Sequence, residues 1–235
     1  MIDIFRLIIG LILYILLSLF SFIPYLNKIY ILLLCKINHY IFGFNKTIVR
    51  DYRKFKHDSK IIVFQHNSYY DFYALAQLFY PNITGVLDSN MLKVPLMKSP
   101  IKNNDVIIIN KKERNNTQKI LKYINNPRKN KYIAISPSGA NVNYSDKIGT
   151  FKTGAFIYMK PVTPILIRYK DDKGTWFPNK KEIFVKEWFL DIFRLRKFYT
   201  CEFIILEEIT AEGCKTPREY ADKVEKYMKT MNNIL

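Results

Sequence analysis

A histidine and an aspartate lie close together in the segment FQHNSYYDF, residues 64–72. His66 follows an apolar run typical of a buried strand, and Asp71 opens a pattern typical of a helix. If His66 ends the strand and Ser68 caps the helix, Asp71 is the third helical residue and can fold back toward the imidazole. A carboxylate on one ring nitrogen fixes the tautomer and makes the other nitrogen a stronger base. The spacing therefore suits a general-base pair.

The same spacing also has a purely structural interpretation. Ser68 and Asp71 fit a capping box with Asp in place of Glu, and His66 is then an ordinary loop histidine. The chain contains no G-x-S-x-G nucleophile elbow. If His66 is a base, the hydroxyl that it activates therefore belongs to a substrate and not to the protein.

Composition limits the class of protein. The chain has 235 residues, which suits one large domain with a buried core. Its 37 Lys and Arg against 20 Asp and Glu give a net charge of +17, which favours anionic partners such as nucleic acid, acidic lipids or phosphorylated substrates. The abundance of Lys, Asn, Ile, Tyr and Phe also fits AT-biased coding, and in that case the positive charge says nothing about a ligand.

The three cysteines are scattered along the chain. Cys35, Cys201 and Cys214 form no CxxC pair or Cys/His cluster, so we expect free thiols and no metal site.

The N-terminal segment Leu7 to Leu26 contains no charged residue. A helix of about 20 apolar residues is about 30 Å long, which matches the hydrocarbon core of a bilayer. The run is too long for a signal peptide, and no small-x-small cleavage site follows it. A second apolar segment, Ile29 to Phe44, is interrupted by Lys36 and predicts an interfacial helix or the second arm of a hairpin. We therefore expect residues 1–45 to anchor the chain in a membrane.

Basic residues are unevenly placed around the first apolar segment. Arg6 alone precedes it, whereas Lys28, Lys36, Lys46 and Arg50 follow it. Positively charged flanks favour the cytosolic side of a membrane. The remaining domain, residues 46–235, is therefore expected on the cytosolic face.

Short β-rich runs alternate with helix-like segments after residue 45. Strands are expected at 60–65, 106–110, 131–136, 163–169 and 201–209, and helices at 71–79, 117–124 (capped by Thr117), 152–160 and 216–234 (capped by Thr216). This alternation predicts an α/β fold with a mostly parallel sheet flanked by helices, preceded by the membrane-associated helix or helical hairpin. Ligands of such sheets bind beyond the carboxyl ends of the strands, where His66, Lys111 and the loop after Ser136 are expected.

The segment HNSYYD resembles the first motif, H-x-S-x-x-D, of the glycerolipid acyltransferases, the family of lysophosphatidate and glycerol-3-phosphate acyltransferases. Further blocks similar to that family follow in the family's order. They are MLKVPLM (91–97), VIIINKK (106–112), ISPSGAN (135–141) and GTFKTGAFIYMKPVTPILI (149–167). The resemblance covers roughly residues 48–210.

The resemblance implies that His66 is the general base and that Asp71 orients it. It implies substrate-binding roles for Lys111, Ser138, Gly139, Asn141 and Lys152. Lys111 and Asn141 stand where the family usually has Arg residues that are taken to bind the acceptor's phosphate, and Ser138 stands where Glu is usual. Gly139 suits a tight turn whose backbone N–H groups face an anion, or an ordinary loop. Gly154 is expected to permit close packing of a helix on the sheet.

The function that follows is that of a membrane-bound O-acyltransferase. It would move a fatty acyl group from acyl-CoA or acyl carrier protein to the hydroxyl of a lysophospholipid, 1-acyl-glycerol-3-phosphate before others, without a metal or a resident cofactor. The alternatives are another acceptor (glycerol-3-phosphate, lysophosphatidylcholine, lysophosphatidylethanolamine or a neutral glycerolipid) and an inactive family member that only binds membranes. A nucleic-acid partner is not expected, because no recognisable binding motif accompanies the charge.

Overall fold

The structure is a computed structural model. It describes residues 8, 9, 12, 13, 15, 16, 33, 36, 37, 44–53, 59–67, 71–79, 81–93, 101, 106–110, 113, 115–125, 132–139, 147–171, 174–175 and 199–235. Within those ranges no helix combines the length and the apolar character needed to cross a membrane. Most of the predicted anchor, residues 1–45, lies outside the described residues, so the anchor stays a prediction.

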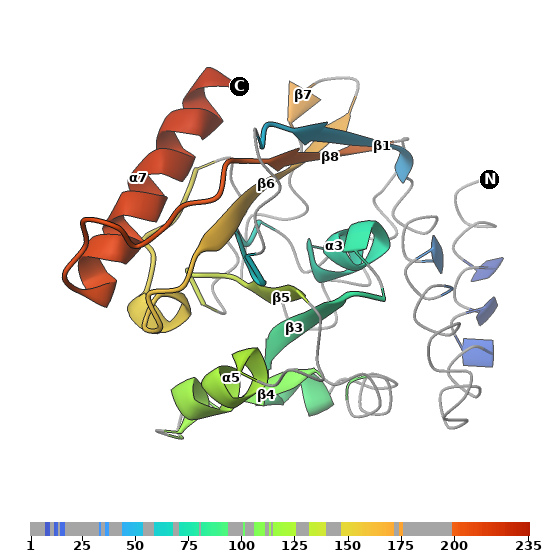
Figure 1. Ribbon diagram of the computed structural model, residues 1–235. Helices are drawn as coiled ribbons and strands as arrows, with labels where there is room; N and C mark the ends of the chain where they lie inside the picture. The colour runs from blue at the N-terminus through green and yellow to red at the C-terminus, as the bar shows by residue number, and fades with distance from the viewer. Residues whose placement is uncertain are drawn as a thin grey trace.

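The described residues form eight strands in one sheet (Figure 1). In spatial order the strands are β1 (Phe44–Asp51), β8 (Tyr199–Ile205), β6 (Val162–Asp171), β2 (Ile61–Phe64), β5 (Tyr132–Ile135), β3 (Ile83–Asp88) and β4 (Ile107–Ile109), with β7 (Gly174–Thr175) paired to β6. Neighbours are parallel, except that β6 runs antiparallel to β8 and to β7. The predicted α/β fold with a mostly parallel sheet is therefore confirmed.

Helices cover both faces of the sheet. Helix α3 (Asp71–Phe79) lies on one face, and α5 (Asn116–Ile124) and α7 (Pro217–Ile234) lie on the other (Figure 1). Strand β2 shows why both faces need cover: Ile62 and Phe64 join the core beneath α3, whereas Ile61 and Val63 join the core beneath α5 and α7. Alternate side chains of a strand point to opposite faces, so a strand that is apolar throughout must be buried on both.

Several predicted element boundaries were wrong. The expected helix 152–160 is only the 3₁₀ helix η3 (Thr153–Ala155) followed by a turn, in which Met159 has a positive φ of 49° that ends any helix before Pro161. The expected strand 201–209 ends at Ile205, and Ile209 forms only an isolated bridge with Val162.

The predicted cap of α5 was also wrong. Thr117 lies inside the helix, and Asn115 occupies the cap position without a side-chain cap bond. The Asn116 side chain instead makes two hydrogen bonds with the backbone of Asn110: it donates to the carbonyl at 2.6 Å and accepts from the N–H at 3.0 Å. This contact fixes the start of the helix one residue earlier than expected.

Strands β1, β3 and β7 and the 3₁₀ helix η2 (Ser89–Lys93) were not predicted. Strand β1 lies at the edge of the sheet, with Lys46, Thr47 and Val49 exposed, so it lacks the apolar run that marks a buried strand. Strand β3 contains Gly85, where the aromatic ring of Phe72 lies so close that any Cβ would clash with it. Glycine is a poor strand former, which hid this strand in the sequence, but position 85 needs a residue without a Cβ because the Phe72 ring lies against it.

The start of α7 is confirmed as predicted. Thr216 is extended (φ −133°, ψ 154°), and its hydroxyl accepts the N–H of Glu219 at 3.2 Å. Pro217 occupies the first turn, and the Glu219 carboxylate accepts the N–H of Lys215 at 2.7 Å. The helix then buries Tyr220, Ala221, Val224 and Met228 against the sheet, at helical spacing.

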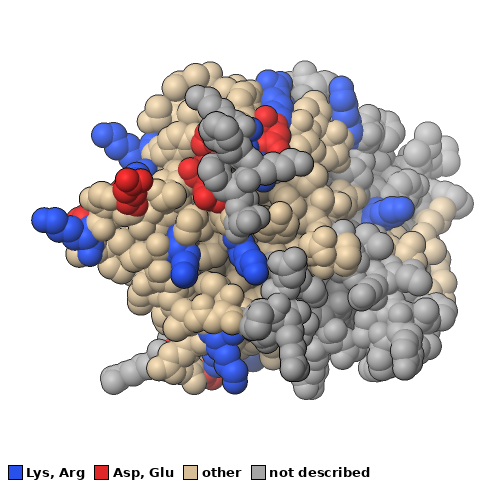
Figure 2. Space-filling model, viewed as in Figure 1, with Lys and Arg blue, Asp and Glu red and all other residues tan. Residues whose placement is uncertain are grey.

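Charges are mixed on the visible surface. Lys and Arg side chains are spread over the face shown in Figure 2, with acidic side chains between several of them. The net charge of +17 counts all 235 residues, of which this face shows the described part only.

We expect the Thr216→Ala substitution to lower the free energy of unfolding by about 1 kcal/mol, because it removes the side-chain cap of α7. Denaturant unfolding of the purified protein measures this loss. Thr210→Ala is the matched control, because the hydrogen bond between Thr210 and α7 uses the backbone carbonyl of Thr210, which accepts from Lys223 and is kept in the variant. Equal stabilities of the two variants would contradict the assigned cap.

Candidate active site

The predicted contact between His66 and Asp71 is present where β2 leads into α3. His66 Nδ1 lies 2.9 Å from Asp71 Oδ2, and the side chains are 19% and 0% exposed. The described part of α3 begins at Asp71, so Asp71 is the first described helical residue, and the predicted cap Ser68 lies outside the described residues. The carboxylate reaches back over the loop as expected.

The Asp71 carboxylate is held by donors from two parts of the chain, the loop after β2 and strand β6. Oδ2 accepts from His66 and from the Asn67 backbone N–H at 2.8 Å, and Oδ1 accepts from the Tyr169 hydroxyl at 2.5 Å. A buried carboxylate is costly unless it is hydrogen-bonded, and these contacts also fix its orientation. Because a carboxylate accepts, the proton of a neutral His66 belongs on Nδ1, and Nε2 becomes the basic atom.

Two buried amides fix the loop that carries His66. The Gln65 and Asn67 side chains both donate to the carbonyl of Ile167, at 3.1 and 3.0 Å. Strand β6 pairs with β2 in parallel but continues beyond its end, so Ile167 lies beside the loop. The residues on both sides of His66 are thus hydrogen-bonded to the sheet, and this fixes the backbone that carries the imidazole.

Tyr169 was missed by the sequence analysis. It is fully buried on β6, 98 residues from Asp71 in the chain, and it ends an apolar run that predicts only a strand. No motif or spacing marks it. Only the pairing of β6 with β2 brings its hydroxyl to the carboxylate.

His66 borders a pocket of about 530 Å³. Its walls are mainly apolar, with Phe64, Val86, Ile109 and Ile135 contributed by four neighbouring strands. Gly139 and Lys152, two of the predicted substrate-binding residues, also line it. A reactive group at the border of an apolar pocket suits a substrate with a long apolar part.

The loop after β5 contains the tight turn that was predicted. Gly139 has a φ of +80°, which favours glycine, and its N–H donates to the Ser136 carbonyl at 3.1 Å. That N–H is therefore used within the turn, and the cation beside it is Lys152, whose Nζ would lie 3.1 Å from a Cβ at Gly139. The Lys152 backbone N–H donates to the Pro137 carbonyl at 2.9 Å, which holds the two segments together.

The remaining predicted binding residues have different positions. Ser138 directs its hydroxyl to that of Ser136 at 3.0 Å, and Ser136, not Ser138, lines the pocket. Lys111 and Asn141 lie outside the described residues, so their roles stay predictions.

Gly154 does not serve close packing, which corrects the expectation from sequence. A Cβ built on Gly154 would meet no heavy atom within 4 Å. The residue instead lines the pocket that His66 borders. Its small size keeps that part of the pocket open.

Cys201 lies near the site but is not suited to act as a nucleophile. It is buried opposite Tyr169 in the pairing of β6 with β8. Burial raises the pKa of the Cys201 thiol well above its ordinary value, and the negative charges of Asp71 and Glu202 add to the rise. A thiol held in its protonated form is a poor nucleophile.

The arrangement is that of a site in which the protein supplies a base and a substrate supplies the nucleophile. Comparison with known proteins gives the family: residues 46–168 match the family model described as acyltransferase. The chain belongs to this family, and the resemblance to glycerolipid acyltransferases that the motifs indicated is confirmed.

Three similar proteins have names that specify an activity. The chain is 24% identical to the lysophospholipid acyltransferase LPCAT4 of Xenopus tropicalis over 208 residues (84% of this chain, 38% of that protein). It is 31% identical to lysophosphatidylcholine acyltransferase 2B of Mus musculus over 120 residues (48% and 23%). The matches therefore span well under half the length of either relative.

A solved structure shows the same fold. It is the 1-acyl-sn-glycerophosphate acyltransferase PlsC from Thermotoga maritima, with a TM-score of 0.55, 16% identity, and coverage of 95% of this chain and 96% of that one.

We expect Tyr169→Phe to lower kcat about ten-fold with little change in KM, because Asp71 loses a donor and holds His66 less firmly. Steady-state acyl transfer measures this effect. Tyr220→Phe is the matched control, since it also removes a buried hydroxyl, one that donates to Lys160 and Ile209. A similar kcat loss in both variants would show that the effect is only structural.

We expect Gly154→Ala to leave the free energy of unfolding within about 1 kcal/mol of the wild type, since its Cβ meets open space. Gly154→Leu should fold equally well but lower kcat/KM about ten-fold by filling the pocket. Thermal unfolding and activity are measured on both variants. Full activity in Gly154→Leu would mean that no substrate occupies this part of the pocket.

Proposed function

We propose that the protein is a membrane-bound acyltransferase that transfers a fatty acyl group from acyl-CoA or acyl carrier protein to the hydroxyl of a lysophospholipid. The observation that carries this proposal is the His66–Asp71 pair at the border of an apolar pocket. The pair supplies a base, and the pocket has the character needed for an acyl chain. Family membership supports transfer of the acyl group in preference to other uses of a base.

The reaction begins when His66 Nε2 takes the proton of the acceptor hydroxyl while its oxygen attacks the thioester carbonyl carbon. Asp71 stabilises the imidazolium that forms, through Nδ1. The tetrahedral intermediate collapses, the carbon–sulfur bond breaks, and the proton on Nε2 passes to the leaving thiolate. The products are an ester and a free thiol, and His66 is neutral again.

The acceptor carries a phosphate in this proposal. Lys152 lines the pocket with His66, and its positive charge supports the binding of an acceptor phosphate there. The name of the PlsC structure specifies 1-acyl-glycerol-3-phosphate as acceptor, and we give this lipid first place. Lysophosphatidylcholine is the second candidate, because the name of the mouse relative specifies it.

The membrane location is supported by the N-terminal residues that the structure describes. Ile8 and Ile12 are helical and are 49% and 51% exposed, and Leu13, Ile15 and Leu16 are exposed as well. Clustered exposed apolar side chains mark surfaces that bind membranes or other proteins. The excess of basic residues after Leu26 supports a position of the domain on the cytosolic face.

The test is acyl transfer by the purified protein in detergent, with labelled oleoyl-CoA or oleoyl carrier protein and a panel of lysophospholipids and glycerol-3-phosphate. We expect His66→Ala to lower the rate about 10²- to 10⁴-fold with the preferred acceptor, because the general base is lost. His57→Ala is the matched control, since it removes a histidine outside the motif.

Two results would overturn the proposal. One is product formation that His66→Ala does not reduce. The other is a folded wild-type protein without product from any donor and acceptor, which would favour a family member that only binds membranes.

A further inference from the structure

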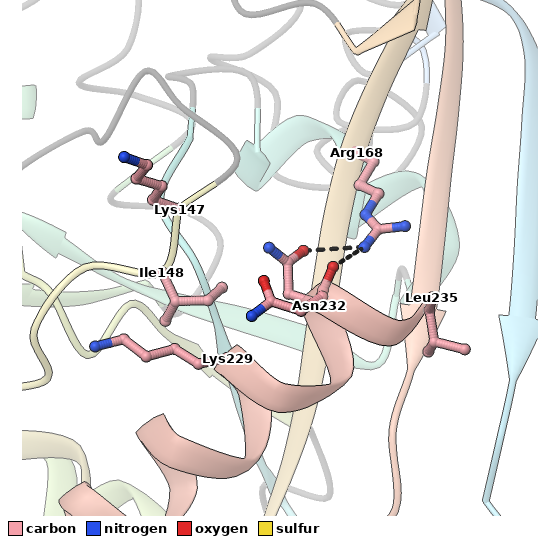
Figure 3. Close-up of a pocket in the computed structure, with 7 residues that line it drawn as sticks. Lys147, Ile148, Arg168, Lys229, Asn232 and Leu235 are labelled. Atoms are coloured by element: carbon pink, nitrogen blue, oxygen red, sulfur yellow. Dashed lines mark hydrogen bonds between the residues drawn. The ribbon is translucent and has the colours of Figure 1, made fainter.

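A second pocket, of about 630 Å³, lies on the α7 face of the sheet (Figure 3). Its lining includes the basic residues Lys147, Arg168 and Lys229, together with Ile148 and the C-terminal end of α7, and none of the described lining residues is acidic. The three basic residues come from separate parts of the fold: Lys147 from the loop before η3, Arg168 from strand β6 and Lys229 from helix α7 (Figure 3). We call this the basic pocket.

Arg168 keeps its positive charge without an acidic partner among the described residues. Its partner across the β6–β8 pairing is Glu202. Both oxygens of Glu202 are engaged elsewhere, by Arg50 at 2.8 Å and by Lys170 at 2.5 Å. The guanidinium of Arg168 instead donates to the backbone carbonyl and the side-chain oxygen of Asn232, at 2.8 and 3.1 Å.

The contact with Asn232 holds the guanidinium in place and offsets the negative end of the α7 dipole. Only one nitrogen of the guanidinium, Nη2, makes these bonds. Arg has five N–H donors in a rigid fork that matches phosphate oxygens. Lys229 pairs with Glu225 at 2.7 Å, a surface pair of small energy. Among the described residues, the three basic side chains that line the pocket therefore outnumber the one acidic side chain, Glu225, that pairs with them, which suits phosphate groups.

Two short segments of the chain link residues of the basic pocket to residues of the His66 site. Arg168 directly follows Ile167, whose carbonyl holds the amides on either side of His66. Lys147 begins the segment that ends at Lys152, which lines the His66 pocket. Five residue steps span at most about 18 Å. One extended molecule that carries phosphates at one end and a reactive carbonyl at the other suits the two pockets together.

We propose that the basic pocket binds the phosphate groups of the acyl donor's coenzyme A part while the thioester lies at His66. This inference rests on the proposed function, which it makes more specific by choosing acyl-CoA over acyl carrier protein. The same phosphate chemistry also occurs in acidic lipid headgroups. The described N-terminal residue Ile37 packs against the core beneath α3, on the opposite face of the sheet, so the basic pocket is placed better for a water-soluble ligand than for a lipid surface.

The test uses the full-length double variant Lys147→Ala/Lys229→Ala. Lys215→Ala/Lys226→Ala is the matched control, with two exposed lysines that do not line the pocket. The first readout is the preference for oleoyl-CoA over oleoyl-pantetheine, which lacks the adenosine phosphates, expressed as a ratio of kcat/KM values. We expect the pocket variant to lower this ratio about ten-fold or more and the control to leave it unchanged.

The second readout needs no catalysis: it is calorimetric binding of adenosine 3′,5′-bisphosphate. We expect about ten-fold weaker binding to the pocket variant, and weaker binding to the wild type as salt rises. If the protein proves inactive, the proposed function fails, and this readout still decides whether the pocket binds the coenzyme's phosphates.

Three results would overturn the inference. The first is an unchanged donor preference in a pocket variant that is active. The second is a wild-type protein that does not bind adenosine 3′,5′-bisphosphate. The third is a variant that loses binding to phosphatidic acid vesicles while its binding of the bisphosphate is unchanged, which would assign the pocket to a lipid headgroup.

Discussion

The structure depends on one buried carboxylate, that of Asp71. Removing a carboxylate from water costs several kcal/mol unless hydrogen-bond donors replace the water. His66, the Asn67 backbone and Tyr169 supply those donors. They belong to the loop after β2 and to β6, so these hydrogen bonds form only when both segments meet the start of α3. The cost of its burial thus enforces the geometry that makes His66 a base.

The sheet topology makes this meeting possible. Strand β2 has four residues and β6 has ten, and they pair in parallel with Phe64 opposite Ile165. The last residues of β6 extend beyond the end of β2. There the Ile167 carbonyl accepts hydrogen bonds from the loop, and the Tyr169 hydroxyl donates to the Asp71 carboxylate. Because side chains alternate along a strand, Arg168 points to the opposite face and contacts α7 instead. One strand therefore serves both the catalytic pair and the basic pocket.

Local chemistry determined what could be predicted from the sequence. The contact of His66 with Asp71, the turn at Gly139 and the cap at Thr216 each depend on residues a few positions apart, and all three are present. The alternation of strand and helix patterns was likewise enough to predict a mostly parallel sheet. These features follow from hydrogen bonds within a turn or from the periodicity of apolar side chains.

Contacts between distant segments could not be predicted. Tyr169 and the Ile167 carbonyl reach the site only through the β2–β6 register, and Arg168 reaches Asn232 across 64 residues. The 152–160 segment looked helical from its apolar spacing, but the positive φ at Met159 and the contact of Lys152 with Pro137 give it another path. The role of Gly154 could not be predicted either, because the open space beside it, part of the pocket that His66 borders, is formed by segments distant in the chain.

Whether Asp71 acts through His66 is tested by a double-mutant cycle on acyl transfer, with His66→Ala, Asp71→Asn and both together. Asn keeps the size of Asp71 and removes its charge. If Asp71 acts only through His66, the double variant loses no more kcat/KM than His66→Ala alone. Losses that multiply would show that the two residues act independently, and the account of a base oriented by its buried carboxylate would be contradicted.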